Sequence, residues 1–234
     1  MNIENYNFNY QMKRILKSRG FTLVELLIVI ALIAILSVAV LATINPIEQS
    51  NKAKDSTIQN DAAEVMNAYE RFYANAQTYP WIKFTDSPAL TIDSGVLFPS
   101  SQAGFGICYS ALSGASTAAG TCNTTGANLG QLIEADELKA SFAGKGEFAT
   151  PGTNGENGLW TYKAQGSGGS IYVCYVPKAK SNRQLSTKLY CLNSTGPTMV
   201  KAGTAPCVAL PATDVTWDTP VLNGIKGMFR CVPE

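Results

Sequence analysis

The sequence contains no histidine in its 234 residues, and charged residues make up only 15% of it. Histidine is the most common ligand for zinc in proteins and the side chain that most often moves protons near neutral pH. Zinc centres and histidine-based catalysis therefore lack their usual residues here. The acidic residues show no spacing that marks a general acid–base pair. We accordingly expect no catalytic activity, no cofactor and no resident metal ion.

The pattern CxxC, typical of redox and zinc sites, is also missing, although the chain has six cysteines. All six follow the long apolar run described below, and their number is even. Both facts favour disulfides formed in an oxidising compartment outside the cytoplasm. Six cysteines allow many pairings, and we predict the set that joins neighbours along the chain, because each bond then closes a plausible loop. The predicted pairs are Cys108–Cys122, Cys174–Cys191 and Cys207–Cys231.

Charge is distributed unevenly along the chain. The whole sequence has a formal net charge of +1. Residues 1–20 hold four basic residues against one acid, a net charge of +3, which leaves −2 for the remainder. Basic residues just before an apolar span hold that end in the cytoplasm. We therefore interpret residues 1–20 as a processing segment and expect the bulk of the chain, beyond the span, on the outer side of the membrane.

The longest apolar run covers residues 21–44 and contains one charged side chain, Glu25. As a helix that rises 1.5 Å per residue it would span roughly 36 Å, which is enough to cross a hydrocarbon core of about 30 Å. A carboxylate inside such a span is costly, so an acid that persists there indicates a functional site with a partner. Cleavage after Gly20 would create a positively charged partner, the α-amino group of Phe21.

Residues 17–30 read KSRGFTLVELLIVI, a basic segment that ends in glycine, followed by Phe-Thr-Leu-Val-Glu and an apolar helix. This stretch resembles the leader-cleavage and assembly motif of the type IV pilin superfamily, which includes the pseudopilins of type II secretion and competence systems. The resemblance implies that a prepilin peptidase cuts between Gly20 and Phe21 and methylates the new amino terminus of Phe21. It also implies that Glu25 pairs with the Phe21 amine of a neighbouring subunit.

The same resemblance implies the partners of the protein. The precursor would span the cytoplasmic membrane once, and an assembly platform driven by a cytoplasmic ATPase would lift it into a helical homopolymer or a mixed pilin filament. We therefore expect a structural subunit of a type IV pilus or pseudopilus at the cell surface, serving adhesion, twitching motility, DNA uptake or secretion. Two alternatives stay open: a minor tip pilin that acts as an adhesin or DNA receptor, and a membrane-anchored or secreted protein of another activity.

Two other interpretations of the apolar run also stay open. A secretory signal peptide would be cut within or after the run, and Ser37-Val38-Ala39 offers small residues at suitable positions. Against this, Glu25 lies where a signal peptide is uncharged, and the run exceeds the usual length of its apolar region. A plain uncleaved anchor explains the length of the run but leaves Glu25 without a partner.

A second helix is predicted after the span. Asn45 and Pro46 either kink a continuous helix or start a new one, in which Glu48 would close a capping box. Apolar residues then recur at helical spacing and form one stripe: Ile58, Ala62, Val65, Met66, Tyr69, Phe72, Tyr73 and Ala76. Tyr79-Pro80 is expected to end this helix. The stripe requires a cover, and a β-sheet from the C-terminal half is the natural one.

The C-terminal half carries strand signals. Runs rich in β-branched and aromatic residues predict strands at 159–164, 171–176, 188–192 and 227–232, the first two forming a hairpin. The expected fold class is α+β: a long N-terminal helix packed on a small antiparallel sheet, similar to pilins. The predicted divisions are a leader (1–20), a transmembrane and assembly helix (21–44), an amphipathic helix (45–79) and a disulfide-bonded globular head (80–234).

Two weaker signals concern ligands. Asp214 and Asp218 are candidate calcium ligands by resemblance to pseudopilins that bind calcium in a C-terminal loop, although a pair of acids without ligand spacing is also typical of a solvated loop. A second signal is a stretch without acids that would either hold a nucleic acid backbone or simply face solvent. Its basic residues are Lys178, Lys180, Arg183, Lys188 and Lys201.

Overall fold

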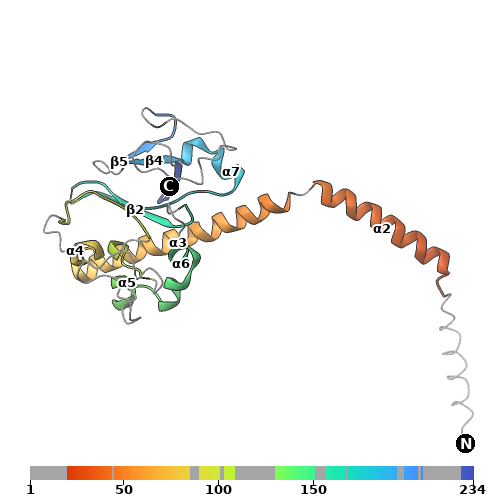
Figure 1. Ribbon diagram of the computed structural model, residues 1–234, viewed down its shortest axis with the longest axis horizontal. Helices are drawn as coiled ribbons and strands as arrows, with labels where there is room; N and C mark the ends of the chain where they lie inside the picture. The colour runs from red at the N-terminus through yellow and green to blue at the C-terminus, as the bar shows by residue number, and fades with distance from the viewer. Residues whose placement is uncertain are drawn as a thin grey trace, which may run out of the picture. The chain divides into compact units, whose positions relative to one another are not determined.

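The computed structural model of the chain describes residues 20–43, 45–84, 90–100, 103–108, 130–150, 156–166, 168–193, 198–204, 207 and 228–234. The chain divides into two compact units, Met1–Pro46 and Ile47–Glu234, and each is described by itself. We call the second one the globular unit. Figure 1 shows the ribbon with the element labels used from here on.

The first unit contains the helix α2 (Leu23–Thr43), which is built almost entirely from Leu, Ile, Val and Ala. Its stretch Leu23–Leu41 is long and apolar enough to cross a membrane, and none of it is buried within the chain. A helix that is apolar on every side is stable only where lipid or other protein surrounds it. A single apolar helix near the N-terminus fits a membrane-anchored precursor.

The second helix, α3 (Pro46–Ala76), has Pro46 as its first residue. Proline suits this position because the N–H that it lacks would have no partner within the helix. The bounds of α2 and α3 therefore favour a restarted helix over a kinked continuous one. At the other end, Gln77 adopts a left-handed conformation (φ 51°), and its N–H bonds to the Tyr73 carbonyl at 2.9 Å. This turn ends α3 just before Tyr79-Pro80.

The predicted apolar stripe of α3 faces the core of the globular unit. Four of its residues are buried, namely Ala62, Val65, Tyr69 and Phe72, and the other four are partly buried against them. Tyr69 also places its hydroxyl group in the core, where it hydrogen-bonds to the Phe105 carbonyl (2.7 Å) and to the Thr161 hydroxyl (2.9 Å). The buried polar group is thereby satisfied, and burial raises the pKa of the Tyr69 phenol.

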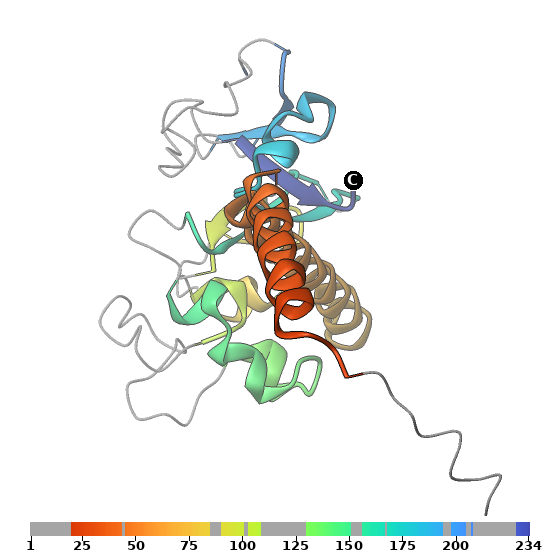
Figure 2. The ribbon, with the colours of Figure 1, turned by 90° about the vertical axis from the view of Figure 1, so that its right-hand side faces the viewer.

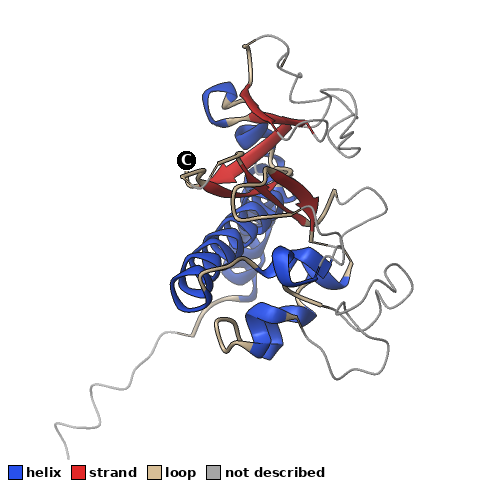
Figure 3. Ribbon diagram, turned by 90° about the vertical axis from the view of Figure 1, so that its left-hand side faces the viewer, coloured by secondary structure: helices blue, strands red, loops and turns tan. Residues whose placement is uncertain are grey.

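Six strands form one sheet in the order β1-β2-β3-β6-β4-β5, and every neighbouring pair is antiparallel. Figure 3 shows these strands in red beside α3. The strands are β1 (Val96–Pro99), β2 (Leu159–Lys163), β3 (Ile171–Tyr175), β4 (Tyr190–Asn193), β5 (Thr198–Lys201) and β6 (Met228–Val232). The four predicted strands are present with small shifts of their ends. The α+β, pilin-like fold class is thus confirmed.

The two faces of the β2–β3 hairpin pack in two different hydrophobic clusters. Leu159 on β2 and Val173 and Tyr175 on β3 pack in the cluster that contains the α3 stripe. Their sequence neighbours Trp160 and Cys174 belong to a second cluster, together with residues of β4 and β6. Alternate side chains of a strand point to opposite faces, so both faces of this hairpin are covered. This explains why the whole of β2 is buried.

The sheet order corrects two of the predicted disulfides. Cys174 bonds to Cys231, and Cys191 bonds to Cys207. The reason is that β6 lies between β3 and β4, which places Cys231 directly opposite Cys174 in the ladder. Figure 2 shows β6 in dark blue across this region. Cys191 is left to close the shorter loop around β5. The predicted pairs Cys174–Cys191 and Cys207–Cys231 are therefore wrong.

The chain-entropy model gives the scale of these two bonds. The sequence separations are 57 residues for Cys174–Cys231 and 16 residues for Cys191–Cys207. Loops of these lengths correspond to about 4 and about 3 kcal/mol, respectively. Cys108 is disulfide-bonded as well. Its predicted partner Cys122 lies outside the described residues, so that pairing stays a prediction.

Short helices complete the globular unit: α4 (Pro80–Phe84), η1 (Ala103–Phe105), α5 (Gln131–Glu134), η3 (Ala140–Gly144), α6 (Gly146–Ala149), α7 (Lys180–Arg183) and η4 (Ser186–Lys188). The start of α5 depends on a close backbone approach. Gly130 has φ 98°, and a Cβ atom there would lie 2.4 Å from the Gly106 carbonyl oxygen. Only glycine fits, because both the conformation and the space exclude a side chain.

Candidate assembly site

The predicted cleavage site lies in an accessible stretch. Gly20 and Phe21 precede α2 without regular structure, and both are exposed. A Cβ atom added at Gly20 would meet nothing within 4 Å, and the Phe21 side chain is 82% exposed. Within the described part of the chain, nothing covers this peptide bond. Cleavage after Gly20 stays a prediction, and the geometry is compatible with access by an enzyme.

Glu25 has its hydrogen-bond partner three residues away. The backbone N–H and the hydroxyl of Thr22 donate to Glu25 Oε2 at 2.9 and 2.8 Å, and the Glu25 N–H donates to the Thr22 hydroxyl at 3.2 Å. This is a capping box, which satisfies two donors that a helix start otherwise leaves unpaired. The pairing of Glu25 with the Phe21 amine of a neighbour stays a prediction. Thr22 is a further partner that was not predicted, although Thr-x-x-Glu is a recognised signature of this arrangement.

The capping box leaves one oxygen of Glu25 unused. Both donors from Thr22 go to Oε2, and among the described residues no hydrogen bond reaches Oε1. The Ser37 hydroxyl, another polar group along α2, donates to the Ile33 carbonyl at 2.7 Å and is thus satisfied within its own helix. Oε1 of Glu25 is therefore the group of α2 best able to accept a hydrogen bond from a donor outside the chain.

In the globular unit, two acids on α3 hold a segment that precedes β4. We call residues 177–183, which include α7, the α7 strap. The buried Asp55 accepts hydrogen bonds from the N–H groups of Lys178 (2.7 Å) and Ala179 (3.0 Å) and from the Asn182 amide (2.7 Å). Glu48, two turns earlier on α3, accepts from the N–H groups of Lys180 and Ser181 at 3.0 and 3.1 Å. These backbone donors hold the pKa of Glu48 below its usual value.

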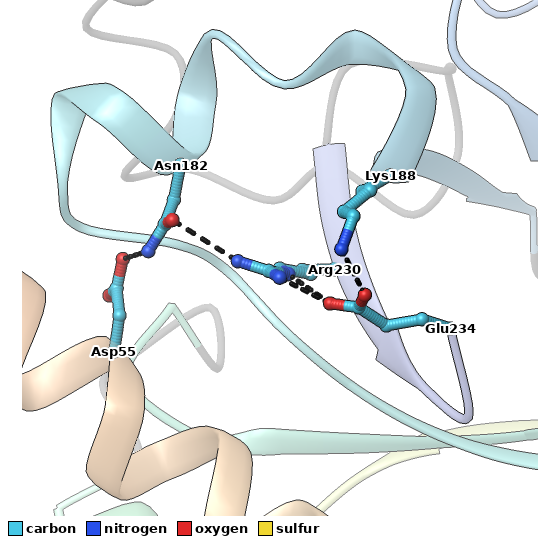
Figure 4. Close-up of polar contacts among 5 residues, drawn as sticks. All are labelled: Asp55, Asn182, Lys188, Arg230 and Glu234. Atoms are coloured by element: carbon cyan, nitrogen blue, oxygen red, sulfur yellow. Dashed lines mark hydrogen bonds and ion pairs between the residues drawn. The ribbon is translucent and has the colours of Figure 1, made fainter.

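The strap continues into a charged network at the end of β6, drawn in Figure 4. Arg230 donates to Asn182 Oδ1 at 3.1 Å and forms a two-pronged ion pair with Glu234, whose other oxygen pairs with Lys188. The hydrogen bond from Lys188 and, to a smaller extent, the one from Arg230 hold the pKa of the Glu234 carboxyl group below its usual value. One chain of contacts therefore joins α3, α7 and β6.

These contacts change the interpretation of the basic stretch. It contains no acid in sequence, but the fold brings Glu48, Asp55 and Glu234 against it. Lys188 is engaged by Glu234, and the Arg183 guanidinium donates to the Pro177 carbonyl at 2.8 Å. An isolated basic patch for a nucleic acid backbone is therefore not what the described residues present. A solvated, internally compensated segment describes them better.

A third acid of α3, Asp61, pairs with Lys145 at the start of α6. The Asp61 side chain is only 8% exposed, whereas that of Lys145 is 35% exposed and its ammonium lies 3.9 Å above the Phe142 ring. Glu147 lies nearby, and burial raises the pKa of its carboxyl group. The structure thus places four acids along α3 and α6 in contact with the protein interior or its edge.

Calcium and other metals find no support in the described part of the chain. Asp214 and Asp218 lie outside the described residues, so the structure says nothing about them. Among the residues that are described, no group of three His, Cys, Asp or Glu side chains comes together to hold a metal ion. The site residues that the structure does place are therefore the capping box at α2 and the acid contacts of α3.

Comparison with known proteins gives one match. Residues 15–41 match the profile of the prokaryotic N-terminal methylation motif. Neither the comparison with curated proteins nor that with solved structures gives a match. The matched residues contain the accessible Gly20–Phe21 bond, the Thr22–Glu25 capping box and most of α2. The chain thus carries the N-terminal motif that is the hallmark of type IV pilins and pseudopilins, in front of a pilin-like α+β unit.

Proposed function

We propose that this protein is a structural subunit of a type IV pilus or pseudopilus filament, with no catalytic activity of its own. The observation that carries the proposal is the methylation motif joined to an apolar helix that buries nothing within its own chain. Such a helix is stable in a lipid bilayer before assembly and in a bundle of identical helices afterwards. The globular unit would then decorate the outside of the filament.

The first step is the removal of the leader. A prepilin peptidase cuts the exposed bond between Gly20 and Phe21, and the new α-amino group on Phe21 is methylated. Loss of residues 1–20 removes a net charge of +3 that would hold this end at the cytoplasmic face. The mature helix then begins with a cation at Phe21 and an acid at Glu25.

The second step is docking into the filament. The capping box keeps Glu25 Oε2 bonded to Thr22 while the subunit waits in the membrane, which lowers the cost of a carboxylate at that depth. Oε1 then accepts a hydrogen bond from the charged Phe21 amine of a subunit already in the filament. The attraction is strong because the site has a low dielectric constant, and two unpaired charges there would be costly. This pair gives the sliding helices a defined register.

Intact-mass analysis of membranes and of sheared surface filaments tests the proposal. We expect a mature species that begins at Phe21, carries one methyl group and is six hydrogens lighter than the fully reduced chain, concentrated in the sheared fraction. A mass that begins after Ala39 would indicate ordinary secretion instead. An intact mass confined to membranes would indicate a simple anchor. Either of these two results would refute the proposed function.

A further inference from the structure

The exposed charges of the globular unit are separated along α3. At one end lie three exposed bases, Lys52 and Lys54 on α3 and Lys180 on α7, which we call the basic end. At the other lie four exposed acids, which we call the acidic end: Glu64 and Glu70 on α3, and Glu134 and Asp136 at α5. Among the described residues, none of these seven side chains belongs to an ion pair.

Contacts to α3 fix where each group lies. The α7 strap bonds to Glu48 and Asp55, so Lys180 lies near the first two turns of α3. The turn after α5 bonds to the last two turns, because Arg71 and Asn75 both donate to the Glu137 carboxylate at 2.9 Å. From Lys54 to Glu70 the helix rises about 24 Å. Figure 1 shows α7 toward the start of α3 and α5 beside its end.

Charges of the opposite sign are occupied within the chain at each end. At the basic end, Glu48 and Asp55 accept hydrogen bonds from backbone N–H groups of the α7 strap, and Glu48 also attracts Lys52, so these two acids offset part of the charge of the three bases. At the acidic end, Arg71 is held by Glu137, and Lys139 is the exposed base that remains there. The surface charge that is left to interact with other molecules is therefore positive at one end and negative at the other.

This polarity matches what an open filament requires. A subunit that adds head-to-tail without closing a ring needs two different, complementary surfaces. Neighbours lying side by side without stagger would place like charges together, whereas an axial shift brings opposite ends together. We propose that the basic end of one subunit contacts the acidic end of a second copy of this chain, and that this contact fixes the stagger between globular units. The proposal rests on the filament function proposed above.

The expected energy of this contact is small, so the contact selects the register between subunits and does not hold them together. Exposed ion pairs are worth about 0 to 1 kcal/mol each, and salt screens them beyond about 8 Å. A few such pairs cannot hold a filament, which depends on packing of the α2 helices. They can select among registers of similar packing energy, because a wrong register places like charges together. Loss of the contact should therefore lower the yield of ordered filaments and leave membrane insertion unchanged.

Charge reversal at each end tests the proposal in cells that assemble the full-length chain. One variant carries Lys52→Glu with Lys54→Glu, the second changes all four acids of the acidic end to Lys (Glu64, Glu70, Glu134 and Asp136), and a third combines all six changes. The matched control is Lys201→Glu, which reverses an exposed base on β5. We expect about fivefold less sheared filament from each of the first two variants. The combined variant should return to within about twofold of the unaltered chain, as should the control.

Co-expression adds a readout that folding defects cannot imitate. The first variant has two acidic ends and the second has two basic ends, so alternation of the two restores complementary contacts. Filament yield from the mixture should exceed that of either variant alone. Normal filament yield after charge reversal at one end would overturn the proposal. So would a low yield from both the combined variant and the mixture, provided that the variant chains resist proteolysis as well as the unaltered chain does. Failure of the filament function itself differs, since the unaltered chain would then give no sheared filaments.

Discussion

Helices α2 and α3 follow one another in the chain, yet they differ in where their acidic side chains find partners. In α2, Glu25 is exposed, and among the described residues its side chain bonds only to Thr22, three residues away. In α3, Asp55 and Asp61 are buried and bond to groups more than 80 residues further along the chain. The acids of α3 thus organise the fold of their own subunit. The acid of α2 only caps the start of its own helix, which leaves its second oxygen available to another molecule.

A variant at Glu25 tests this difference between the two helices most directly. We expect Glu25→Ala to reduce sheared filaments more than tenfold, because the Phe21 amine loses its partner in a medium of low dielectric constant. Membrane insertion and the unfolding of the globular unit should not change, since the hydrogen bonds of the Glu25 side chain go to Thr22 at the start of its own helix. Quantitative immunoblots of membranes and sheared filaments measure the effect. Normal filament yield from this variant would defeat the pairing mechanism.

At Asp55 we expect a loss of stability of the globular unit. Asp55→Ala leaves two backbone N–H groups and the Asn182 amide without their acceptor, which should lower the free energy of unfolding by about 3 kcal/mol. Urea unfolding of the full chain in detergent micelles measures this loss. Ser56→Ala is the matched control, because that hydroxyl is exposed and bonds only to a carbonyl of its own helix. Equal stability of the two variants would show that Asp55 does not anchor the strap.

A smaller effect is expected at the Asp61–Lys145 pair. Lys145→Met removes the ion-pair partner of a buried carboxylate, and the partial exposure of Lys145 limits the loss to about 1 to 2 kcal/mol. Adding Asp61→Asn should recover part of that loss, because no buried charge then stays unpaired. Chemical unfolding of the two single variants and the double variant completes the cycle. Additive losses would mean that the two side chains do not interact.

The smallest effect concerns the pH dependence contributed by Glu48. Its pKa is lower in the folded chain than in the unfolded one, so its contribution is present above the unfolded pKa of about 4.3 and disappears as the pH falls through the folded value. The difference in unfolding free energy between the unaltered chain and Glu48→Gln should therefore be largest near neutral pH and shrink in acid. A difference that stays constant down to pH 3 would contradict the carboxylate contacts with the α7 strap.

The sequence predicts what depends on neighbours along the chain. The cleavage and capping signals, the apolar span and the stripe of α3 are all patterns within about 30 residues. The hairpin of β2 and β3 is equally local, which is why its ends are nearly right. The short edge strands β1 and β5 were missed because four residues give little pattern, and their pairing is decided by the strands beside them.

Contacts between distant residues were beyond sequence reasoning. The disulfide prediction failed because nothing in the spacing of the cysteines indicates that β6 inserts between β3 and β4. Asp55 is not part of the apolar stripe of α3, and nothing near it in the sequence indicates burial, since its backbone donors lie 123 and 124 residues away. A buried acid becomes recognisable only when the fold supplies its donors.

The position of β6 has a consequence for how the protein is made. Residues 228–232 follow every other strand in the chain, yet they lie in the middle of the sheet. Until they arrive, β1–β3 and β4–β5 are two separate pieces with unpaired edges that face each other. The sheet therefore becomes continuous, and Cys231 can reach Cys174, only after residues 228–232 have been made and exported. A nascent subunit stalled a few residues short would expose both edges, which makes it a natural target for quality-control proteases.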